Sequence, residues 1–534
     1  MDSIQVSDKE YEELTPALSE ESFQHLLGQI DIISQSLTSN NNNNNNVFTH
    51  HPEFIQNGIM RDYQIEGLNW LIKMNECGIN GILADELGLG KTLQIISLLA
   101  YLNECKGIKG PHLIIVPLST VHNWLKELNK WYLKARVIKY QGDKTTRDSL
   151  KKEIQLGQFD ICLTTYECSI QDASFLIRVP WVYMILGEGF PINNLNSKRT
   201  KALMSYKSQF RLLSSGSPLM NDLQEALALC YFLIPNICTS SEEFNEWFGT
   251  KDNENQHEMV EKLHKVMKPF IMRRLKSQIE KSIPPKNTTV LHADLTLMQS
   301  ELYKNLLAKY KELFPNGLSS QNGSDQNFIN LCMQLRKVCN HPYLFGVEPE
   351  PKINGEHLIT NSGKMMVLDN LLRALKEQDR KVLIFTQMSK MMEIIDRYMK
   401  FRNYKSHKLD GSTDFHSREA MVKSFNEESS DYFAFVLTTR AGGLGLRFEN
   451  TNTVIFYDSD WNPILDLMAE DRVHYIGQTL PVHIYRLTCK HTIEEIILQR
   501  SELKSQIPMN VNEVLSPTNE DLEKILKISE IHLN

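Results

Sequence analysis

Short apolar runs alternate with helix-length segments in two separate parts of the chain, and this alternation limits the possible fold more than any other feature. Within residues 51–235 the runs lie at 112–117, 159–166, 181–186 and 210–216. Within residues 361–490 they lie at 381–386, 404–411, 433–439, 452–458 and 483–488. Such runs are typical of strands buried on both faces of a parallel sheet. The pattern predicts an α/β fold with two lobes facing one cleft.

The segments outside these two lobes differ from them in composition. Residues 236–360 read as a lysine-rich, helical insert or linker, with the helical character strongest over 236–345. Residues 1–50 form an acidic tail with an asparagine run at 40–46, which we expect to be partly disordered. Eight acidic residues and Lys9 give residues 1–36 the whole net charge of −7. The net charge therefore neither favours nor excludes a polyanionic partner.

Composition excludes several other classes of protein. The 534 residues are 41% hydrophobic and 23% charged, which is typical of globular chains with more than one domain. The nine cysteines lack the spacing of paired metal ligands, so we expect buried, reduced thiols. There is no signal-peptide pattern, and no apolar run approaches the ~20 residues that span a bilayer. We expect an intracellular protein with no membrane partner.

The stretch GILADELGLGKTLQ, residues 81–94, has the parts of a phosphate-binding loop. Gly88 and Gly90 permit close approach of the backbone, Lys91 supplies charge for the β- and γ-phosphates, and the Thr92 hydroxyl is the candidate magnesium ligand. The general pattern has a glycine where this chain has Asp85, and glycines before a helix also form simple turns. The candidate nucleotide-binding residues of the loop are Asp85, Gly88, Leu89, Gly90, Lys91 and Thr92.

Seven further stretches follow in order: MRDYQIEGLNWL (60–71), SGSPLMNDLQE (215–225), MQLRKVCNHPYLF (333–345), KLDGST (408–413), TTRAGGLGL (438–446), YDSDWNP (457–463) and DRVHYIGQ (471–478). With the loop, they make the chain resemble the Swi/Snf-type chromatin-remodelling ATPases, above all the imitation-switch branch, over about residues 52–504. That family has aspartate at the position of Asp85. An RNA helicase would share the two lobes but not residues 333–345 or 457–463.

The resemblance implies two RecA-like lobes that bind ATP and magnesium between them. It also implies double-stranded DNA and nucleosomes as partners, and a nuclear location. Gln64 would read the adenine, and Ser215–Gly216–Ser217 would couple the nucleotide to movement of the lobes. From the second lobe, Gly443, Gly445 and Arg472 would approach the nucleotide.

Two motifs depart from the family pattern. Where the family has Asp-Glu-Ala-His, this chain has Gly187, Glu188, Gly189 and Phe190. The glutamate that polarises the attacking water remains as Glu188, but the aspartate that orients magnesium is absent. The family has two arginines three residues apart, as fingers to the γ-phosphate; here Arg472 is followed by Tyr475, and Met468 replaces a glutamine. We take Glu188 and Arg472 as the catalytic candidates and expect weakened hydrolysis.

Two classes of function therefore stay open. One is an ATP-driven DNA translocase that moves nucleosomes, and the other is a pseudo-ATPase that serves as a DNA- or chromatin-binding scaffold.

The candidate DNA-binding residues are Lys198 and Arg199, Arg273 and Arg274 within KPFIMRRLK (268–276), and Trp461. For each basic cluster a solvated surface is the alternative, and for Trp461 a buried core position. Residues 491–534 are expected to form a brace helix, over 491–504, and a tail. The residues after this helix are too few for the DNA- and linker-sensing module of imitation-switch enzymes, so we expect no sensing of linker length unless an accessory subunit supplies that module.

Overall fold

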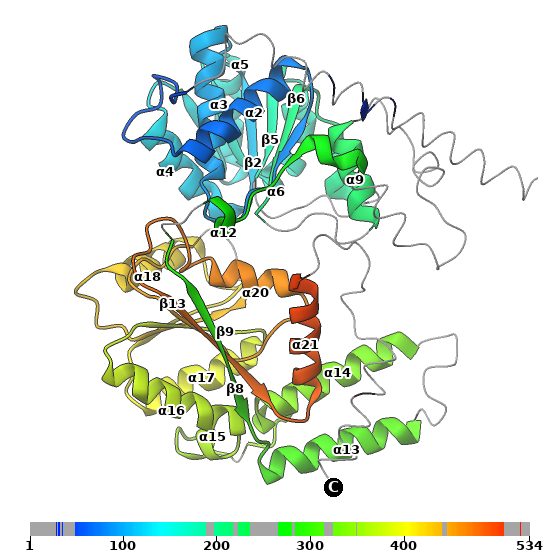
Figure 1. The fold of residues 1–534 in the computed structure, drawn as a ribbon, viewed down its shortest axis with the longest axis vertical. Coiled ribbons are helices and arrows are strands. Elements are labelled where there is room, and N and C mark those ends of the chain that lie inside the picture. The colour runs from blue at the N-terminus through cyan, green and yellow to red at the C-terminus, as the bar shows by residue number, and fades with distance from the viewer. Residues whose placement is uncertain are drawn as a thin grey trace, which may run out of the picture. The chain divides into compact units, whose positions relative to one another are not determined.

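The computed structural model describes residues 49–187, 197–216, 223–234, 265–279, 283–313, 324–348, 350–439 and 446–506, and the isolated residues 28, 30, 31, 35 and 524. The chain divides into two compact units, the first up to Ile279 and the second from Glu280 to Pro508. Each unit is a parallel sheet with helices packed against it (Figure 1).

The first sheet has seven parallel strands in the order β3-β4-β2-β5-β6-β1-β7. Successive residues of a central strand enter different cores, as Ile114 and Ile115 of β2 do. A parallel sheet covered on both faces requires this arrangement, which explains the uninterrupted apolar runs. The strands are β1 (Gly81–Leu83), β2 (His112–Val116), β3 (Val137–Tyr140), β4 (Ile161–Thr165), β5 (Trp181–Leu186), β6 (Ser208–Ser214) and β7 (Ile271–Met272).

Helices cover both faces of this sheet. One core contains side chains of α2 (Asp62–Glu76), α3 (Lys91–Lys106) and α4 (Val121–Trp131). The other contains side chains of α5 (Lys144–Gln155), α6 (Tyr166–Gln171), α7 (Ala173–Leu176), α8 (Lys198–Met204) and α9 (Leu223–Leu233). The chain then forms β7 and the short helix α12 (Lys276–Ile279) before it leaves the first unit.

The second sheet has six parallel strands in the order β10-β11-β9-β12-β13-β8. They are β8 (Lys286–Ala293), β9 (Val382–Thr386), β10 (Ser406–Leu409), β11 (Ala434–Thr438), β12 (Thr453–Phe456) and β13 (Val482–Cys489). One face packs on α15 (His357–Thr360), α16 (Gly363–Glu377) and α17 (Ser389–Phe401), and the other on α18 (Phe415–Asn426) and α20 (Pro463–Glu470). A third cluster joins α13 (Leu297–Leu313), α14 (Ser324–Asn340) and α21 (Ile493–Gln506).

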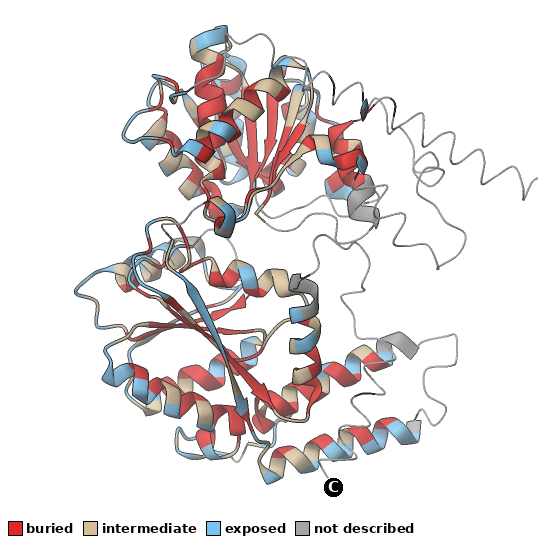
Figure 2. Cartoon of the chain, in the orientation of Figure 1, coloured by how far each residue is buried: buried red, intermediate tan, exposed pale blue. Residues whose placement is uncertain are grey.

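The predicted α/β class with two RecA-like lobes is confirmed, and every apolar run named as a strand forms one. The expectation of helix throughout 236–345 is wrong at two places. Helices α13 and α14 lie there as expected, but β7 joins the first sheet and β8 joins the second. Strand β8 is an edge strand that is exposed over most of its length, so its sequence lacks the apolar signal of a buried strand (Figure 2). The insert boundaries 236–360 stay a prediction.

The cysteines agree with the expected reduced thiols where the structure describes them. Cys77 is half-buried, Cys105 is exposed, and six others are buried; the eight described cysteines are all free. Among the described helices, none is long and apolar enough to cross a membrane.

His112 makes the stability of the first unit depend on pH. The side chain is 1% exposed at the start of β2, and neither ring nitrogen has a hydrogen-bond partner among the described residues. Burial lowers the pKa of His112 from 6.5 to about 4. As the pH falls from 6.5 toward 4, the unfolded chain gains a proton that the folded chain does not, so folding loses stability.

We expect the wild-type chain to lose about 2 kcal/mol of unfolding free energy at this site between pH 7 and pH 5. His112→Phe should remove that part of the pH dependence because phenylalanine does not titrate. Urea unfolding at both pH values measures it. His122→Phe, at an exposed position of α4 in the same unit, is the control and should keep the wild-type pH dependence. If the unfolding free energy of His112→Phe kept the wild-type pH dependence, His112 would not be its source.

Candidate nucleotide-binding site

The phosphate-binding motif lies between β1 and α3, at the carboxyl edge of the first sheet. Gly88 and Gly90 have φ values of 89° and 79°, in the left-handed region that favours glycine. A Cβ atom on Gly90 would collide with Nε2 of Gln64. The loop therefore has the strand–turn–helix backbone that brings N–H groups together for an anion.

Gln64 and Lys91 both contact this loop. Gln64 is buried in α2, where its Nε2 donates to the Leu89 carbonyl at 3.2 Å. Its Oε1 accepts from the Arg61 N–H at 3.0 Å. Lys91 is 4% exposed, and its Nζ donates to the carbonyls of Asp85 at 2.8 Å and Glu86 at 3.3 Å. Half-buried Thr92 follows as the second residue of α3.

Strand β6 brings Ser215 and Gly216 to the same edge. The Ser215 N–H donates to the Leu83 carbonyl of β1 at 3.1 Å. A Cβ atom on Gly216 would collide with Leu87 and lie 3.1 Å from Nζ of Lys91. The phosphate-binding motif and Ser215–Gly216, which are far apart in the sequence, thus lie side by side at Lys91.

Gly187 directly follows β5, the strand next to β6, at the position where the family pattern has its metal-orienting aspartate. Its N–H donates to the Ile115 carbonyl at 2.8 Å, and its own carbonyl accepts from the Tyr166 hydroxyl at 2.8 Å. A Cβ atom here would lie 2.6 Å from Cγ1 of buried Val116. The described residues thus leave no room for a side chain at 187 unless Val116 moves. Glu188, Gly189, Phe190 and Ser217 lie outside the described residues.

Asp85, at the position of the missing first glycine, is fully buried. The guanidinium of Arg274 donates to both of its carboxylate oxygens, from Nε at 2.9 Å and from Nη2 at 2.5 Å. Gln94 of α3 donates to the same carboxylate at 3.2 Å. Sequence reasoning gave Arg274 only a DNA-binding role. A buried aspartate signals that some cation must be near, but the sequence does not say which one.

In the second unit, Arg472 and Tyr475 follow α20. Arg472 is 3% exposed, and its Nη1 lies 3.5 Å from the Leu446 carbonyl. Tyr475 is also buried, which raises the pKa of its hydroxyl. The guanidinium of exposed Arg447 lies over the Tyr475 ring, 5.6 Å from its centroid. Gly443 and Gly445 lie outside the described residues.

The candidate DNA-binding residues occupy different environments. Lys198 and Arg199 are exposed in the first turn of α8, where they are free to meet a polyanion. Arg273 is half-buried, and burial lowers the pKa of its guanidinium. The guanidinium of Arg274 faces the loop aspartate, while Trp461 is half-buried against the cluster of α13, α14 and α21. DNA binding at these residues stays a prediction.

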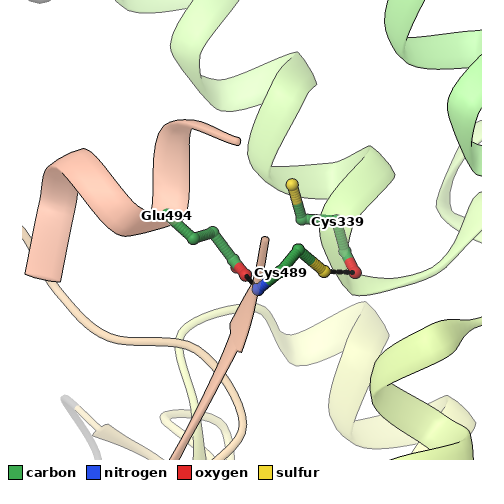
Figure 3. Close-up of side chains that lie close together, drawn as sticks. All are labelled: Cys339, Cys489 and Glu494. Atoms are coloured by element: carbon green, nitrogen blue, oxygen red, sulfur yellow. Dashed lines mark hydrogen bonds between the residues drawn. The ribbon is translucent and has the colours of Figure 1, made fainter. Parts of the chain in front are cut away.

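Cys339, Cys489 and Glu494 form the one group with metal-ligand chemistry within the described residues (Figure 3). Both oxygens of Glu494 already have protein partners, since Oε1 accepts from Nζ of Lys364 at 2.5 Å and Oε2 from the Cys489 N–H at 3.0 Å. Burial raises the pKa of the Cys489 thiol. A protonated thiol beside a buried ammonium is a poor metal site. We therefore assign this cluster a structural role.

Lys364 is the cation at the centre of that cluster, and it is fully buried. Besides Glu494, its Nζ donates to Oδ1 of Asn340 and to the Tyr457 carbonyl, each at 2.8 Å. Burial alone would lower the pKa of this ammonium, but the Glu494 carboxylate outweighs it, so that the pKa is raised. The ion pair thereby connects α14, α16, α21 and the end of β12.

Comparison with known proteins gives two matches to family models. The SNF2-related domain matches residues 63–344, and the helicase conserved C-terminal domain matches residues 363–479. The chain is 46% identical to a probable chromatin-remodeling complex ATPase chain of Oryza sativa subsp. japonica, over 84% of this chain and 40% of the relative. It is 46% identical to the human SWI/SNF-related matrix-associated actin-dependent regulator of chromatin subfamily A member 1, over 86% of this chain and 44% of that protein.

A yeast relative gives a similar result. The ISWI chromatin-remodeling complex ATPase ISW2 of Saccharomyces cerevisiae is 45% identical over 85% of this chain and 41% of its own length. The chain thus spans less than half the length of these relatives.

Lys91→Ala removes the charge that the phosphate-binding motif presents. We expect at least a tenfold loss of ATP affinity, about 1.4 kcal/mol, in a titration with a fluorescent ATP analogue. Lys106→Ala, at the exposed end of the same helix, is the control and should bind as the wild type does. Equal affinities in all three chains would refute the assignment of the loop.

Glu494→Gln leaves the Lys364 ammonium buried beside a neutral amide. We expect this substitution to cost ~3–5 kcal/mol of unfolding free energy, as measured by urea denaturation. Asp294→Asn breaks an exposed ion pair with Lys490 in the same unit and should cost less than ~1 kcal/mol. Similar small losses for both variants would show that the buried pair is not a stabilising contact.

Proposed function

Because the chain belongs to the SNF2-related ATPases that carry a helicase C-terminal domain, we propose that it is an ATP-dependent chromatin remodeller of the imitation-switch type. In this proposal it translocates on double-stranded DNA, acts on nucleosomes in the nucleus, and hydrolyses ATP weakly. The observation that carries the nucleotide-binding part is the loop at β1, with Lys91 held between the loop carbonyls and Gly216.

The residues present fit ATP and magnesium in part. Gly88, Gly90 and Lys91 form the phosphate cradle, and the Thr92 hydroxyl would hold magnesium, which neutralises charge on the phosphates when bound. At the end of β5, however, Gly187 supplies no carboxylate, and Val116 fills the space of a side chain there. ATP binding therefore depends on groups that are intact, while hydrolysis lacks one of its usual groups.

A second candidate function is a nucleotide-binding scaffold on DNA or chromatin that does not turn ATP over. Three departures from the family pattern favour it, namely Gly187 after β5, Phe190 in place of the histidine, and Tyr475 in place of the second arginine. An arginine finger contributes about 10³–10⁵ in rate, and Arg472 is retained as one of the two, so the loss at Tyr475 is smaller than that. The retained Glu188 and Arg472 favour the enzyme.

Steady-state ATPase measurements with and without duplex DNA separate the two candidates. We expect weak, DNA-stimulated turnover below about 1 per second in the wild-type chain. Gly187→Asp with Tyr475→Arg should raise that rate by more than the product of the single variants, because the two groups act on one transition state. Val116→Ala is added to the Gly187→Asp variants to make room for the new aspartate. Val116→Ala alone serves as the control.

Two results would contradict the proposal that Gly187 and Tyr475 are what weakens hydrolysis. Wild-type turnover at or above about 1 per second would show that Glu188 and Arg472 suffice. A restored chain that folds and binds ATP but gains no turnover would favour the scaffold.

A further inference from the structure

The carboxylate of Asp85 poses an electrostatic problem for a nucleotide-binding loop. It is fully buried, and its own backbone carbonyl accepts from Nζ of Lys91, the residue that faces the phosphates. A buried carboxylate at this position adds negative charge where a triphosphate must bind. Without a cation beside it, the charge would oppose both folding of the loop and binding of ATP.

Arg274 supplies that cation with a geometry that fixes its guanidinium. Nε and Nη2 donate to the two oxygens of Asp85, at 2.9 and 2.5 Å. Nη2 also donates to Oε1 of Gln94 at 2.9 Å, and Nη1 donates to the backbone carbonyl of Tyr63. A two-point contact with a carboxylate is a strong and directional form of charge pairing. The same guanidinium therefore joins the loop to both α2 and α3.

The surroundings leave room for this side chain and little else. A Cβ atom on Gly67 of α2 would collide with the Gln94 amide and lie 2.7 Å from Nη2 of Arg274. The Arg274 side chain is only 12% exposed. Its Nη1 also lies 3.8 Å from Oε2 of the exposed Glu66, but the shorter contacts of the guanidinium are with the Asp85 carboxylate.

The backbone around Arg274 is attached to the same loop. Its carbonyl accepts from the Glu86 N–H at 3.0 Å, and the Lys276 N–H donates to Oε2 of Glu86 at 2.7 Å. Just before it, Met272 of β7 accepts from the Ala84 N–H at 2.7 Å. The segment that carries the arginine thus binds the loop backbone at both Ala84 and Glu86.

We propose that Arg274 is a positioning residue for the phosphates of ATP. By neutralising the Asp85 carboxylate and accepting from the N–H of the next residue, Glu86, Arg274 fixes the Asp85 carbonyl to which Lys91 donates, and it offsets negative charge beside the triphosphate. The inference rests on the proposed ATP binding and adds to it a residue outside the phosphate-binding motif. Nothing in the proposal requires Arg274 to touch the nucleotide.

The test compares Arg274→Gln with a matched ion pair elsewhere in the same unit. Arg147 and Asp172 lie 2.6 Å apart with side chains 13% and 11% exposed, away from the loop. We expect Arg274→Gln to weaken binding of a fluorescent ATP analogue at least tenfold, and Arg147→Gln to change it less than twofold. Thermal unfolding of both variants shows how much stability each one loses.

A charge-neutral double variant separates electrostatics from packing. Asp85→Asn with Arg274→Gln removes both charges and leaves a polar side chain at each position, so ATP affinity should return to within about threefold of the wild type. Arg274→Lys keeps the charge without the two-point contact. Its ATP affinity should lie between that of the wild type and that of Arg274→Gln. In any variant that turns ATP over, the KM for ATP should rise more than kcat falls.

Several outcomes would overturn this inference while the wild type still binds ATP and Lys91→Ala does not. They are wild-type affinity in Arg274→Gln, an equal loss in Arg147→Gln, or a double variant as weak as Arg274→Gln. If Arg274→Gln does not fold, Arg274→Lys decides the matter, and wild-type affinity in that variant overturns the inference. Failure of the wild-type chain to bind ATP would instead overturn the proposed function, and this inference with it.

Discussion

The ion pair between Asp85 and Arg274 joins two parts of the first unit that lie 189 residues apart in the sequence. The loop at β1 depends on it because a buried carboxylate without a cation is costly. The pair lies just beyond the pairing of β7 with β1, which gives the three-residue strand β1 a neighbour on each side. Arg274 lies shortly before Ile279, where the first unit ends. The loop that receives ATP in our proposal is therefore attached to the segment through which the chain leaves that unit.

The second unit contains a comparable buried pair with a different consequence. Lys364 and Glu494 connect α16 to α21, and the same lysine reaches the ends of α14 and β12. Because both oxygens of Glu494 are used, the two nearby cysteines remain ordinary buried thiols. Residues 491–504, expected to form a brace helix, are anchored by a charge inside the core as well as by apolar packing.

The two departures from the family pattern are accommodated by neighbouring side chains. At Gly187, Cγ1 of Val116 lies where an aspartate side chain would start, and the Tyr166 hydroxyl donates to the Gly187 carbonyl. At Tyr475, the ring is buried and the guanidinium of Arg447 covers it at cation–π distance. Neither position is left as a void. This is why restoring the missing groups requires an adjustment of Val116 as well.

The sequence by itself determined the fold class, because strands buried on both faces and the turn of a phosphate-binding loop are local patterns of apolar residues and glycines. It also determined the family and the two degenerate motifs. It missed β8, since an exposed edge strand has no apolar signal, and β7, which is only two residues long. Only the tertiary structure decided that Arg274 faces Asp85 rather than solvent, and that Lys364 satisfies Glu494. Charge pairing across such separations depends on which strands lie side by side. Local sequence patterns do not predict that arrangement.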